Sequence, residues 1–142
     1  MKTQNYKNHA RMVPGFHYLA MISILALIGG SINYLFHATP ENKYLASLLV
    51  LTTIVLAILW IYIRVFPLKA QDRAIKAEEA LRYFIMTGKA LPNELTMNQI
   101  VALRFASDAE FLALLERAIK ENLSNKEIKL AIQHWKADFH RV

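Results

Sequence analysis

The sequence contains no cysteine, so disulfide bonds and cysteine nucleophiles are excluded, and the redox compartment is left open. It also lacks a glycine-rich phosphate loop and an HExxH zinc motif. No internal repeat or low-complexity segment is present. Charge is the most informative absence, because acidic and basic residues are missing from two long stretches near the start of the chain.

These two uncharged stretches are apolar and long. The first is apolar from about Tyr18 to Phe36, and the second runs from Tyr44 to Ile63. A helix rises 1.5 Å per residue, so about 20 residues cover the roughly 30 Å hydrocarbon core of a bilayer. The pattern predicts two transmembrane helices joined as a hairpin over residues 16–66, preceded by a polar segment, 1–15, and followed by a domain, 67–142.

The alternative is a pair of buried helices in a soluble core. Such helices normally carry a polar stripe on the side that faces water. The second stretch has only Ser47, Thr52 and Thr53 as polar aliphatic residues, which leaves no solvated stripe. We therefore favour membrane spans. The long first run and the poor cleavage site around Ala38 predict an uncleaved anchor rather than a signal peptide.

The net charge of +6 could indicate nucleic-acid binding, but its distribution does not. Residues 67–142 hold twelve Lys/Arg and ten Asp/Glu, and the remaining excess of positive charge flanks the apolar runs. Basic residues beside a span set its orientation. We expect both termini to be cytoplasmic in a bacterial inner membrane, with lipid contacts from Arg64, Lys69, Arg73 and Lys76.

Small residues on each span predict how the two helices meet. On the first span Ser23, Ala26, Gly30, Asn33 and His37 share a face, and on the second Ala46, Thr53, Ala57 and Trp60 do. Small side chains let helices approach closely in lipid. We interpret the faces as the seam of the hairpin; the other interpretation is a docking face for a partner span.

The remaining chain predicts four helices packed as a small bundle. The first should follow a kink or restart at Pro67 and end at Gly88. Three more should begin at capping boxes, in which a Ser or Thr and a Glu or Gln three residues later satisfy each other's backbone donors. The boxes are Thr96 with Gln99, Ser107 with Glu110, and Ser124 with Glu127. The last helix should bury Ile128, Ala131, Ile132, Trp135 and Phe139.

A heptad-like apolar stripe lies on the first of these four helices. Its residues are Ala70, Ala74, Ala77, Leu81 and Phe84. Such spacing is typical of a coiled coil, but it extends over fewer than three heptads and is mostly alanine. We expect it to pack on the rest of the bundle, and we place a partner face on the last two helices.

Several runs of the sequence resemble a known family. They are QNYKNHAR (4–11), VP (13–14), LRFASD (103–108) and WKAD (135–138). They are similar to a family of short bacterial two-span membrane proteins with a domain of unknown function, some loosely called ABC transporter permeases. The resemblance implies two spans and a helical tail over the whole chain, and it implies no activity.

The sequence offers no catalytic constellation. His134 and Asp138 would lie one helical turn apart, but a pair without a clear third ligand predicts no metal site. Arg104 and Asp108 flank a helix junction and predict a structural ion pair. We therefore expect no catalytic residues, no cofactor-binding residues and no bound metal.

These patterns together predict an all-α, non-enzymatic integral membrane protein. We expect an accessory or scaffold protein that docks a protein partner through its cytoplasmic helical domain, with membrane lipid as a second partner and a homo-oligomer possible. No nucleic acid is expected. The alternative is a small subunit of a transporter or channel complex. That alternative normally requires polar residues inside the bilayer, and the spans offer little beyond Asn33.

Overall fold

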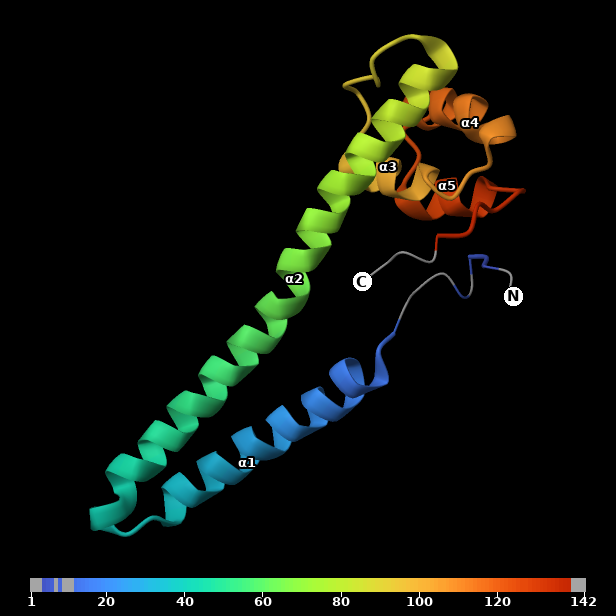
Figure 1. The fold of residues 1–142 in the computed structure, drawn as a ribbon. Helices are drawn as coiled ribbons and strands as arrows, with labels where there is room; N and C mark the ends of the chain where they lie inside the picture. The colour runs from blue at the N-terminus through green and yellow to red at the C-terminus, as the bar shows by residue number, and fades with distance from the viewer. Residues whose placement is uncertain (1–3, 7, 9–11, 139–142) are drawn as a thin grey trace. The chain divides into compact units, whose positions relative to one another are not determined.

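A computed structural model describes residues 4–6, 8 and 12–138 of the chain (Figure 1). Every named element in these residues is a helix, which confirms the all-α prediction. The contacts divide the chain into two units. We call Met12–Pro67 the apolar unit, and Met1–Arg11 together with Leu68–Val142 the polar unit.

The apolar unit contains α1 (Met21–His37) and the first part of α2 (Lys43–Thr87). A π-helical segment, Gly15–Ala20, leads directly into α1 after Pro14. A short 3-10 helix, Pro40–Asn42, connects α1 to α2. The first helical run ends at His37, because Ala38 is extended, and Thr39 is also extended, as a residue before proline prefers. Gly15–His37 and Pro40–Thr87 are both long and apolar enough to cross a membrane.

Helix α2 runs through Pro67 as one element of 45 residues. We predicted a kink or a restart of the helix at this proline, and the restart is wrong. Proline removes one backbone donor from a helix, yet the helix continues on both sides of it. The end of α2 follows the prediction, because Gly88 adopts φ +70° and its N–H donates to the Phe84 carbonyl at 2.7 Å.

The polar unit contains the last part of α2 and the short helices α3 (Met97–Leu103), α4 (Asp108–Lys120) and α5 (Asn125–Ala131). All three predicted capping boxes are present, at Thr96, Ser107 and Ser124. The helices enclose an apolar core whose largest fully buried side chains are Phe105, Phe111, Leu103, Leu115 and Ile128.

The turn between α4 and α5 is set by an asparagine. Asn122 has φ +50°, and the Leu123 N–H donates back to the Ala118 carbonyl at 3.1 Å. This left-handed residue satisfies the last carbonyls of α4 and lets Ser124 begin α5 directly. The buried Gln99 side chain adds a tie, donating to the carbonyls of Ala118 and Leu123 at 3.3 and 3.0 Å.

Helix α5 ends earlier than predicted. Ile132 has an extended backbone, φ −66° and ψ 122°, and residues 132–138 form no helix. Ile132 is still buried and Trp135 packs against the core, whereas Phe139 lies outside the described residues. The predicted inner face of the last helix is therefore partly an extended segment.

Candidate functional site

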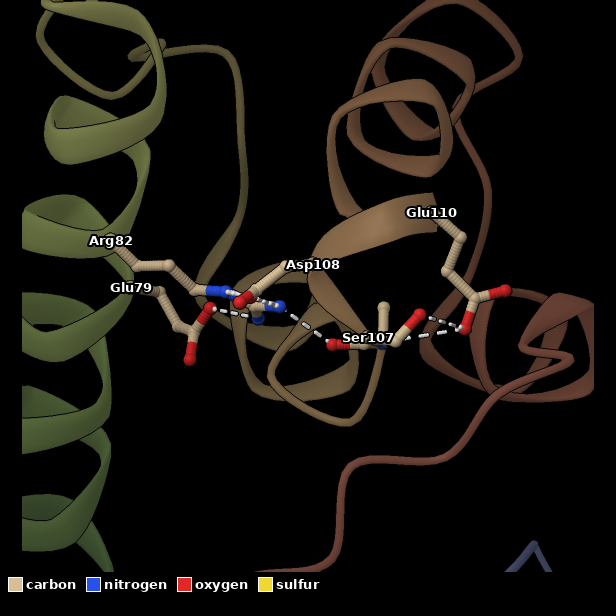
Figure 2. Close-up of polar contacts among 6 residues, drawn as sticks. Glu79, Arg82, Ser107, Asp108 and Glu110 are labelled. Atoms are coloured by element: carbon tan, nitrogen blue, oxygen red, sulfur yellow. Dashed lines mark hydrogen bonds and ion pairs between the residues drawn. The ribbon is translucent and has the colours of Figure 1, made fainter.

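Arg82 of α2 joins α2 to α4 through a charged cluster, in which the Arg82 and Glu79 side chains are buried and the Asp108 side chain is 76% exposed (Figure 2). Its guanidinium donates to Glu79 at 3.0 Å, to Asp108 at 2.8 Å and to the Ala106 carbonyl at 2.8 Å. The side chains of Arg82 and Glu79 are only 10% and 8% exposed. The guanidinium also lies 4.1 Å above the centre of the Phe111 ring. These contacts fix α2 to the start of α4.

Glu110 forms a second polar node, also drawn in Figure 2. In addition to closing the capping box with Ser107, its carboxylate accepts the backbone N–H groups of Gln133 and His134, each at 3.0 Å. Burial would raise the pKa of the Glu110 carboxyl, but the N–H groups that donate to it hold its pKa below the ordinary value. This one side chain ties the extended segment after α5 to the start of α4.

The Glu110 node explains why α5 is short. Two backbone donors that a longer helix would use internally are given to a carboxylate more than 20 residues earlier. Backbone hydrogen bonds from Ser107 to the His134 carbonyl and from Lys136 to the Phe105 carbonyl complete a short antiparallel bridge. A long-range contact has here replaced the local helix that the sequence pattern favoured.

The residues weighed for metal binding and ion pairing have other partners. With α5 ending at Ala131, His134 and Asp138 are not on one helical turn, and the Asp138 carboxylate pairs with Arg104 at 3.4 Å. The predicted pair of Arg104 with Asp108 is therefore wrong, since Asp108 pairs with Arg82. Within the described residues, no group of three or more His, Cys, Asp or Glu could hold a metal ion.

The amino-terminal segment joins the polar unit through Gln4. The Gln4 side-chain amide donates to the Asp138 carbonyl at 3.3 Å and accepts from the Asp138 N–H at 2.7 Å. This paired contact joins residues 134 positions apart. A single glutamine in a polar stretch gives no local signal of such a contact, so sequence reasoning missed it.

The heptad-like stripe, which we call the α2 stripe (Ala70, Ala74, Ala77, Leu81 and Phe84), faces away from the core, contrary to expectation. All five of its residues are exposed, with Leu81 and Phe84 at 59% and 56% of their surface, and the neighbouring Ile85 at 75%. The face of α2 that packs inward instead carries Ile75 and Glu79. Paired charges from Glu79 and Arg82 thus occupy the position that the stripe was expected to take.

A hollow of about 470 Å³ opens beside the Arg82 cluster. Its lining combines three acidic residues, two basic residues and three apolar ones. They are Glu78, Glu79, Asp108, Arg82, Lys136, Leu81, Ile85 and Met86. This lining holds no serine, histidine or cysteine that could act as a nucleophile. A mixture of apolar side chains and paired charges suits contact with another protein surface.

In the apolar unit, the seam between the helices uses one predicted face and one that was missed. On α2 Ala46 and Thr53 are buried, and Trp60 stacks on Phe16 with ring centres 5.4 Å apart. On α1 the expected small residues are exposed, and the buried or half-buried residues are Ile24, Ile28, Ser31 and Leu35. The Ser31 and Thr53 hydroxyls are 3.3 Å apart. Ala26 and Gly30 instead line an apolar groove of about 340 Å³ beside it.

The protein is thus all-α. Two helices that are long and apolar enough to cross a membrane are followed by a small unit of short capped helices. The model of a family of unknown function, DUF6526, matches residues 1–142, and the chain belongs to this family. No curated protein and no solved structure matches the chain.

Proposed function

We propose that this protein is a non-enzymatic integral membrane protein that docks a protein partner through its polar unit. The first part of the proposal rests on exposed apolar surface. Only 6% of the most apolar stretch of the first long helix and 11% of that of the second are buried. A helix in the core of a soluble protein buries most of such a stretch, whereas lipid covers it in a membrane.

The orientation follows from the basic residues around the spans. More Lys and Arg residues flank the outer ends of the two spans than the connecting segment. Because basic residues favour the cytoplasmic side, we propose that the spans lie in a bacterial inner membrane with both termini in the cytoplasm. The chain has no cysteine, so single substitutions give clean labels. A cysteine at Asn42 should react with a membrane-impermeant thiol reagent in intact cells, and one at Asn5 should not. The reverse pattern would contradict this orientation.

The docking part of the proposal rests on the polar unit. Its exposed large apolar side chains, among the described residues, gather on α2 as Leu81, Phe84 and Ile85, with Leu130 on α5. Leu81 and Ile85 line a hollow that also carries paired charges. Exposed apolar groups rimmed by polar ones are the usual composition of a protein interface. The face with most of this surface is therefore α2, rather than the last two helices alone.

The groove between α1 and α2 is the feature that bears on the alternative, a small transporter or channel subunit. It is lined mainly by apolar side chains, and its two buried hydroxyls, of Ser31 and Thr53, lie 3.3 Å apart and are also within donating distance of the Ile28 and Val50 carbonyls of their own helices. An ion or solute path normally presents charged or polar groups to its lumen. This lining favours the scaffold function over the transport function.

The experiment that tests the proposal exchanges the polar unit. The chain with residues 68–142 replaced by an unrelated helical bundle is compared with the full chain after crosslinking in native membranes. We expect the exchanged protein to remain in the membrane fraction and to lose the crosslinked partners. Unchanged partners would assign docking to the apolar unit instead, and loss of the full chain from the membrane fraction would overturn the membrane assignment.

A further inference from the structure

The α2 stripe has the spacing of a two-helix interface. Its members follow one another at intervals of four, three, four and three residues, which is the a and d pattern of a heptad repeat. In that register Ala74 and Leu81 are a residues, and Ala70, Ala77 and Phe84 are d residues. All five are exposed on the side of α2 opposite Ile75 and Glu79. No described part of the polar unit covers them.

We propose that a second copy of this chain covers the α2 stripe, so that two α2 helices pair in parallel through residues 70–85. This rests on the proposed function, because two copies anchored with the same orientation in one membrane present their α2 helices in parallel. It also deepens that function, since it names the partner of the α2 face.

Charge complementarity supports a second copy as the occupant. In a parallel pair, a g residue of one helix faces the e residue of the following heptad on the other. Here the g residue is Arg73 and the e residue is Glu78, and both are exposed. Two-fold symmetry forms this Arg–Glu pair twice. The next g and e residues, Ala80 and Ile85, are both apolar and extend the contact.

The packing of the stripe also fits a close pair of helices. Alanines at 70, 74 and 77 allow the backbones to approach, and Leu81 and Phe84 supply the larger buried area further along α2. The hollow beside Leu81 and Ile85 lies on the e side of the stripe and carries the Glu78 carboxylate, where the partner copy brings its arginine. A lipid-binding face would instead carry Lys and Arg on its flanks, and Glu78 occupies one flank.

The test uses single cysteines oxidised in native membranes of the full chain. Ala77→Cys and Phe84→Cys place a thiol in the seam, and Lys76→Cys places one at an exposed position at the same height outside it. We expect about ten times more disulfide-linked dimer from the two seam positions than from the control, because a and d residues meet across the interface. Equal yields from all three, or crosslinks only to a protein of different mass, would overturn the second copy as partner.

A charge exchange tests the register. With Phe84→Cys as reporter, Arg73→Glu should lower the dimer yield, because each introduced glutamate then faces the Glu78 carboxylate of the other copy with like charge. Adding Glu78→Arg should restore the yield, whereas a yield unaffected by either change would contradict the parallel register. If Phe84→Cys remains monomeric while the exchanged polar unit still loses its partners, the homodimer fails and the scaffold function stands. If the full chain leaves the membrane fraction, the scaffold function itself fails.

Discussion

The two halves of α2 are both built with apolar side chains outward, but for different reasons. In residues 43–67 the inward face carries Ala46 and Thr53, and large apolar side chains cover the rest. In residues 68–87 the inward face carries Glu79 and Arg82, and Leu81 and Phe84 point outward. In the proposed function lipid covers the first arrangement, since it is as apolar as the side chains. The second half is too charged to enter lipid, and we propose that a protein neighbour covers its exposed apolar side chains.

The comparison also separates two ways of stabilising a helix pair. The first half of α2 meets the first helical run through one hydroxyl pair with α1 and through Trp60, which stacks on Phe16 and donates its indole N–H to the Phe16 carbonyl at 3.2 Å. The second half meets the polar unit through a buried arginine with three separate partners. Breaking a buried charged cluster costs more than removing one hydroxyl, so the second half should be far more sensitive to single substitutions.

Arg82→Ala should have the largest effect. It leaves the Glu79 carboxylate buried without its cation and frees α4 from α2, so we expect the polar unit to lose about 3–5 kcal/mol of stability. Thermal unfolding of the full chain in detergent micelles, followed by limited proteolysis, measures the loss. Arg117→Ala is the matched control, because its pair with Glu121 is on the surface. A loss as small as that of the control would contradict the structural role of the cluster.

Glu110→Gln should have an intermediate effect. It replaces a carboxylate that accepts three backbone N–H groups. A hydrogen bond to a charged group contributes about 1.5–3 kcal/mol to stability. We expect a loss of about 1–3 kcal/mol. Amide hydrogen exchange should show faster exchange at Gln133 and His134. Unchanged exchange there would show that the carboxylate does not hold the extended segment.

The same carboxyl predicts a pH dependence. Its pKa in the folded chain lies below the ordinary value of 4.5, so the unfolded chain binds the proton more tightly. Its contribution to stability is present above pH 4.5 and is lost as the pH falls through the folded pKa. The midpoint of thermal unfolding should therefore drop in acid for the natural chain and less so for Glu110→Gln. Equal drops of the unfolding midpoint in the two proteins would contradict the assignment of this pH dependence to Glu110.

Thr53→Val should have the smallest effect, because hydrogen bonds between membrane helices contribute about 0.6 kcal/mol on average. It removes the hydroxyl that faces Ser31 and keeps the shape of the side chain. Thr52→Val is the control on the next residue, where the hydroxyl donates only to the Leu48 carbonyl of its own helix. Thermal unfolding in micelles should separate the two variants slightly. A loss for Thr53→Val as large as that for Arg82→Ala would remove the contrast between the halves.

The parts of the fold that depend on local chemistry were predictable. The capping boxes at Thr96, Ser107 and Ser124 and the left-handed Gly88 specify helix ends from neighbouring residues alone. The two apolar helices follow from length and composition in the same way. None of these features needs information from a distant part of the chain.

The parts that depend on distant contacts were not predictable. Helix α5 ends early because the Glu110 carboxylate accepts backbone N–H groups of the residues that follow it. The α2 stripe points outward because Arg82, on another side of α2, pairs with Asp108 of α4. One signal was present in the sequence. Ile75 and Met86 give α2 a second apolar side, which a helix packed on only one face does not need. Nothing local indicated that Gln4 contacts Asp138.

The most direct test compares the outward faces of the two halves of α2 in native membranes. Single cysteines at Ile54, Ile58 and Ile61, all exposed in the structure, are treated with a charged thiol reagent beside Lys76→Cys as reference. We expect the three to stay unreactive because lipid covers them, and Lys76→Cys to react readily. Reaction of the three as fast as the reference would contradict membrane insertion of the first half of α2.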